Sequence, residues 1–114
     1  MKDFCIVDEK NVATVSTNEN DKSTLIIFEM ESGKCVLDIE IPMKIDQMVW
    51  SSSKNAILVK SKDSDETFSV DKLGKTKKVL DCLYLAQNDK ETFAIEGKYN
   101  KEGGYIEEIK ILSV

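Results

Sequence analysis

Three acidic residues stand close together at Asp63, Asp65 and Glu66, and a D-x-D spacing of this kind can supply oxygen ligands to calcium. The helix–loop–helix calcium motif also requires a glycine at its sixth position and a glutamate at its twelfth, and neither falls there. Glu107 and Glu108 are adjacent, so their carboxylates point to opposite faces of a strand and form no acid–base pair. The pattern predicts solvated acidic turns, with no catalytic residue and no metal ligand.

Histidine is absent from the sequence, which removes Ser–His and Cys–His nucleophile pairs and imidazole metal ligands. The three cysteines, Cys5, Cys35 and Cys82, are odd in number, widely spaced and flanked by apolar residues. We therefore expect reduced, buried thiols in a cytoplasmic protein that has no cofactor and is not an enzyme. A carboxylate-dependent hydrolase is the least favoured alternative.

The charge balance is acidic, with 16 basic residues against 21 acidic ones and a net charge of −5. A nucleic-acid-binding surface needs concentrated Lys and Arg, and the densest group, four lysines between positions 72 and 78, is typical of a solvated turn. The first ten residues hold no apolar stretch long enough for a signal peptide, and no run is long enough to span a bilayer. We expect neither nucleic acid nor a membrane as a partner.

Short apolar segments alternate with polar turns along the whole chain. Segments of this length rich in Val, Ile, Phe and Tyr favour strands. Residues 25–28 and 56–59 are apolar throughout, which is typical of strands covered on both faces. Residues 78–86 also fit the spacing of a short helix. We expect a single all-β domain over residues 1–114, with about eleven short antiparallel strands.

The turns recur at a spacing near 40 residues. Asn11, Asn55 and Glu91 each stand just before an apolar strand, and they are 44 and 36 residues apart. Four short strands per unit at this period are typical of a β-propeller blade. The predicted repeats are residues 1–42, residues 43–81 and a partial third repeat over residues 82–114.

Residues 45–59, with the sequence IDQMVWSSSKNAILV, resemble the first half of a WD-repeat blade. Residues 65–71, DETFSVD, and the Gly-Lys pair that follows them resemble the second half. This resemblance covers nearly the whole chain and implies a β-propeller. The family's Gly-His pair is absent, and Val70-Asp71 stands where its Trp-Asp dipeptide would be. The chain therefore resembles a divergent WD-repeat protein without the family's hydrogen-bonded tetrad.

Propellers close with about four to eight blades, whereas the predicted strands make two blades and three quarters of a third. Open blade faces and an unpaired outer strand favour association. We therefore predict a non-enzymatic interaction or scaffold module, a partial propeller completed by a second copy or by another protein chain. The alternatives are a self-contained small β-barrel or sandwich that binds a peptide or small ligand, and a piece of a longer propeller.

If the repeats align, three of their turns share one rim, and the acids on that rim favour a basic or mixed-charge partner. These turns are Asn18–Lys22, Lys62–Glu66 and Lys98–Gly103. Trp50, the only tryptophan, is either a core anchor or a hot spot for a partner. The residues expected to bind a partner are Trp50, Asp63, Asp65, Glu66, Tyr105 and Ile109.

Overall fold

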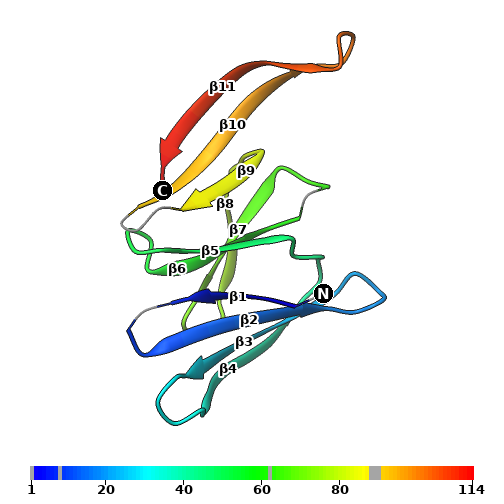
Figure 1. Ribbon diagram of the computed structural model, residues 1–114. Helices are drawn as coiled ribbons and strands as arrows, with labels where there is room; N and C mark the ends of the chain where they lie inside the picture. The colour runs from blue at the N-terminus through cyan, green and yellow to red at the C-terminus, as the bar shows by residue number, and fades with distance from the viewer. Residues whose placement is uncertain (1, 8, 62, 88–90) are drawn as a thin grey trace.

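Antiparallel strands arranged in three sheets make up the fold (Figure 1). The structure, a computed structural model, describes residues 2–7, 9–61, 63–87 and 91–114. The all-β prediction is confirmed. Within these residues there is no helix, and so none that is long and apolar enough to cross a membrane.

Each of the three sheets is open and joins strands in their order along the chain. Each also lies inside one of the three predicted repeats. The first sheet contains β1 (Lys2–Ile6), β2 (Asn11–Thr17), β3 (Ser23–Glu29) and β4 (Cys35–Ile41). The second contains β5 (Gln47–Ser51), β6 (Ala56–Lys60), β7 (Glu66–Asp71) and β8 (Thr76–Asp81). The third contains β9 (Tyr84–Gln87), β10 (Thr92–Asn100) and β11 (Tyr105–Ser113).

The second sheet lies between the other two (Figure 1). Its first strand, β5, contacts both β1 and β9, which are the first strands of the neighbouring sheets. The three sheets therefore come together along their first strands. The later strands of each sheet extend away from this line, and among the described residues β4, β8 and β11 each pair with one strand only, so their outer edges are unpaired.

Two apolar clusters hold the sheets together. All five residues of β6 are buried, because this strand contributes side chains to both clusters. Between the second and third sheets lie Leu58, Cys82, Leu85 and Ala94. Between the first and second sheets lie Val7, Ala13, Val15, Leu25, Ile27, Ile41, Ile45, Met48, Ile57, Val59 and Val70.

Of the two segments expected to be covered on both faces, only residues 56–59 are buried throughout. In β3, Leu25 and Ile27 are buried, whereas Ile26 and Phe28 are half-exposed. The prediction for residues 25–28 is therefore wrong. The reason is that the first sheet is covered only on the side of the second sheet, so its strands keep one open face.

The helical alternative for residues 78–86 is also wrong. This segment contains the end of β8 and most of β9, and the two strands belong to different sheets. The antiparallel pairing of β8 with β7 and of β9 with β10 overrides the local helical spacing.

Buried polar side chains connect the elements that follow one another. The Ser23 hydroxyl, fully buried, donates a hydrogen bond to the Met43 carbonyl at 2.7 Å and accepts one from the Ile45 N–H at 3.1 Å. It thereby fixes the linker between the first and second sheets against β3. The Thr92 hydroxyl donates to the Trp50 carbonyl at 2.6 Å, which joins the third sheet to the second.

Candidate functional site

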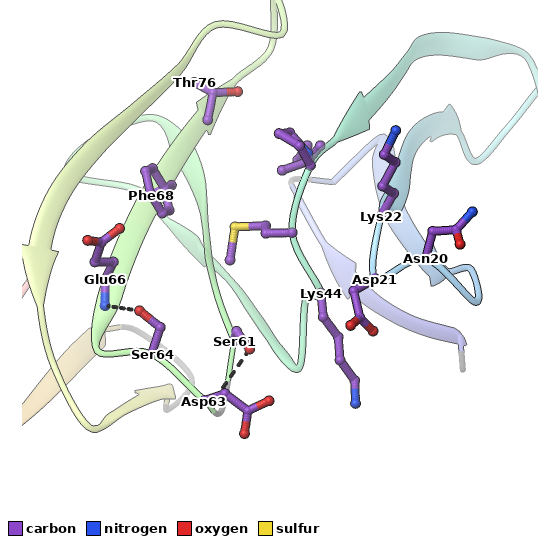
Figure 2. Close-up of a pocket in the computed structure, with 13 residues that line it drawn as sticks. Asn20, Asp21, Lys22, Lys44, Ser61, Asp63, Ser64, Glu66, Phe68 and Thr76 are labelled. Carbon is purple, nitrogen blue, oxygen red and sulfur yellow. Dashed lines mark hydrogen bonds between the residues drawn. The ribbon is translucent and has the colours of Figure 1, made fainter.

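A groove with a volume of about 600 Å³ opens between the first and second sheets (Figure 2). The turn between β2 and β3 and the linker after β4 form one wall. The loop between β6 and β7 and the first residues of β7 form the other. Two of the three turns expected on a common rim, Asn18–Lys22 and Lys62–Glu66, therefore meet at this groove through their described residues.

The third turn of the predicted rim does not reach the groove. No described residue of Lys98–Gly103 lines the groove. This turn joins β10 to β11 at the far end of the third sheet, which the second sheet separates from the groove (Figure 1). The groove is therefore lined by two of the three turns of the predicted rim.

The floor of the groove is apolar. It consists of Ile41, Pro42 and Met43 from the linker side and Phe68 from β7. Ile41 is buried and both Met43 and Phe68 pack against the larger apolar cluster. The floor is thus an extension of the core that opens to solvent. Pro42 directly follows β4, and nothing in the sequence indicated that this linker faces Phe68.

The rim of the groove carries the acidic residues that the sequence indicated. The Asp63 N–H donates to the Ser61 hydroxyl at 3.3 Å, and the Glu66 N–H donates to the Ser64 hydroxyl at 3.2 Å. These bonds fix the backbone of the loop and leave both carboxylates exposed. Neither carboxylate has a hydrogen bond or an ion pair with another described residue. Both carboxylates can accept hydrogen bonds from donor groups of a partner.

The six residues expected to bind a partner do not form one site. Asp63 and Glu66 line the groove, whereas the Asp65 carbonyl accepts the Cys82 N–H at 2.8 Å on the other side of the second sheet. Trp50 is half-buried against the larger cluster, with the Lys72 amine 5.6 Å from the centre of its ring. The last two residues, Tyr105 and Ile109, are 54% and 60% exposed on β11.

The third sheet carries an exposed apolar row, of which the sequence analysis named only Ile109. Tyr84, Ile95 and Ile111 are direct neighbours across β9, β10 and β11. Tyr84 is 56% exposed and Ile111 is 64% exposed. Ile109 extends this row, because residues two apart in a strand share a face. Alternation of apolar and polar residues in the segment 105–112 was the signal for this row, although such alternation does not show which face of the strand is covered by another sheet.

The cysteines differ in their surroundings. Cys82 is buried, as expected, but Cys35 is exposed, so the expectation of a buried thiol is wrong there. Cys35 begins β4 next to a bulge at Ile27/Phe28 and pairs with Phe28 on the uncovered face of the first sheet. The side chain of Cys5 lies outside the described residues.

Burial raises the pKa of the Cys82 thiol above its ordinary value of 9.0, against the opposing effects of a Thr67 hydrogen bond and nearby Lys60. An acid with a raised folded-state pKa stabilises the fold fully below the unfolded pKa, and loses that contribution as pH rises through the folded pKa. We expect the difference in unfolding free energy between wild type and Cys82→Ala to shrink as pH rises from 8 to above about 9. Urea titrations of both proteins, with Cys35→Ala as the matched control, measure this difference. A difference that stays constant over this range contradicts the prediction.

Among the described residues, no group of three or more Cys, Asp or Glu side chains is arranged to hold a metal ion. Comparison of the chain with models of protein families gives no match, and comparison with curated proteins gives none either.

Proposed function

We propose that this chain is a non-enzymatic, cytoplasmic interaction or scaffold module, a partial WD-repeat-like β-propeller whose open sheet faces are covered by a second copy or by another protein chain. The observation that carries the proposal is the uncovered apolar row on the third sheet. Tyr84, Ile95 and Ile111 lie side by side there, and Ile109 is adjacent. Surface patches of contiguous apolar side chains of this kind are typical of interaction sites.

The arrangement of the sheets supports the propeller interpretation. The first strands of the three sheets lie next to one another, and the sheets pack face to face with β6 covered on both sides. Blades of a propeller are related in the same way around a central axis. In the second sheet β6 is covered on both faces, whereas the first and third sheets each have one open face.

The open faces favour association energetically. Covering one Ile side chain contributes about 1.5–3 kcal/mol, and the row offers several such side chains on one face of the third sheet. Edge strands with unpaired backbone groups, such as β11, add a second driving force. The free thiols Cys35 and Cys82 support a reducing compartment.

The proposal is tested by measuring native mass with light scattering after size exclusion, on protein isolated from its own source and on the chain made alone. We expect a mass above 12.9 kDa, as a multiple of the chain or as a stoichiometric complex. Ile109→Lys/Ile111→Lys is expected to return the chain to a monomer, because two buried charges oppose a covered face. Leu73→Lys, at a turn residue that is 81% exposed, is the matched control.

A wild-type monomer of 12.9 kDa that unfolds cooperatively in both preparations contradicts the proposal. So does an assembly whose mass is unchanged by Ile109→Lys/Ile111→Lys, since its interface then lies away from the third sheet.

A further inference from the structure

We propose that the groove between the first and second sheets binds an extended segment of a partner protein in which a Lys or Arg stands two residues from an apolar side chain. The basic side chain lies at the acidic rim that carries Glu66 and Asp63, and the apolar one lies on the floor beside Phe68. This surface is distinct from the apolar row of the third sheet, so the inference does not depend on how the sheet faces are covered.

The spacing of the predicted segment follows from β7. Glu66 and Phe68 are two residues apart in this strand and both line the groove (Figure 2). Their Cα atoms are therefore about 6.7 Å apart along the strand. An extended peptide repeats its side chains on one face at the same interval, so a basic residue at one position and an apolar residue two positions later match Glu66 and Phe68.

The charges of the groove favour a basic segment. Asp21, Asp63 and Glu66 all line it, and none has a side-chain hydrogen bond or ion pair with another described residue. Of the two lysines that line it among the described residues, Lys22 pairs with Glu40 at 3.8 Å, which offsets its charge. Lys44 is the remaining cation. Among the described residues of the groove, the carboxylates available to a partner thus outnumber the free amines, and the net charge of −5 acts in the same direction.

The shape of the groove favours a chain segment with an apolar anchor. Its volume of about 600 Å³ falls in the usual range of ligand sites, and its floor is apolar while its rim is polar. The floor is also fixed before binding, because Ser23 holds the Met43 carbonyl and the Ile45 N–H. A preformed floor reduces the conformational entropy lost on binding.

The test uses a fluorescein-labelled peptide, Gly-Arg-Ser-Leu-Gly, and fluorescence anisotropy with the full chain. We expect measurable binding that weakens as salt rises from 0.05 to 0.5 M, because exposed ion pairs are screened. Two comparison peptides, with Glu in place of Arg or Ser in place of Leu, are each expected to bind more weakly.

Asp63→Asn/Glu66→Gln is expected to weaken binding of this peptide about fivefold, the loss of two exposed ion pairs. The matched control, Glu31→Gln/Asp38→Asn, changes the net charge equally at exposed residues outside the groove and is expected to leave binding unchanged. Light scattering on both variants checks that the native mass is that of wild type, which separates this test from the test of association.

Three outcomes overturn the inference. They are no binding of Gly-Arg-Ser-Leu-Gly at millimolar protein, equal binding of the Glu and Arg peptides, and equal weakening by the groove variant and its matched control.

Discussion

Leu25→Ala is expected to lower the free energy of unfolding by about 3 kcal/mol. Leu25 is fully buried in the middle of β3 and belongs to the cluster between the first and second sheets. The substitution removes apolar contacts and leaves a cavity. The two sheets cannot move together to close it, because backbone hydrogen bonds within each sheet hold its strands in place. Urea unfolding followed by circular dichroism measures the change.

The same substitution at Leu73 is the matched control for Leu25→Ala. Leu73 lies in the turn between β7 and β8 and is 81% exposed, so Leu73→Ala is expected to change stability by less than about 0.5 kcal/mol. If both variants lose a similar amount, the first and second sheets do not share a packed core.

Ser23→Ala is expected to destabilise the fold by about 2 kcal/mol. The Ser23 hydroxyl is buried, donates to the Met43 carbonyl and accepts from the Ile45 N–H, so its loss leaves two backbone groups in the linker without their partner. Removing one partner of a buried hydrogen bond costs the desolvation of the group left behind. Thermal and urea unfolding measure the effect.

Ser32→Ala provides the comparison for Ser23→Ala. The Ser32 hydroxyl also makes a hydrogen bond, to a Glu29 carboxylate oxygen at 2.8 Å, but in an exposed turn where water replaces it. We expect a change of less than about 0.5 kcal/mol. Because Ser23 fixes the floor of the groove, Ser23→Ala is also expected to weaken binding of the Gly-Arg-Ser-Leu-Gly peptide. Ser32→Ala is expected to leave this binding unchanged. Equal stability of the two variants contradicts the role given to Ser23.

Local chemistry made the all-β class predictable. Turns such as Glu31–Lys34 and Asp71–Lys75 interrupt apolar segments at intervals suited to hairpins, and the described strands pair in that order. Burial was less predictable because it depends on which sheet faces another. Ile26 and Phe28 belong to an apolar run but lie on an uncovered face, and Cys35 is exposed for the same reason.

The candidate site was predictable only in part. Asp63 and Glu66 stood out as acids in a turn, and they do line the groove. Their neighbour Asp65 does not, because the loop turns it toward Cys82. The apolar floor could not be foreseen, since Pro42 and Phe68 are 26 residues apart in the sequence and meet only when two sheets stack.

The connectivity of the sheets has a consequence for synthesis on the ribosome. Every strand pair in the described chain joins strands that are consecutive in sequence. Each sheet can therefore form as soon as its own hairpins emerge, without waiting for a distant partner strand. The covered face of the first sheet, however, stays exposed until β6 and β7 have left the exit tunnel. During that interval the nascent chain presents Leu25 and Ile27 to solvent, and it is then that a chaperone would bind it most strongly.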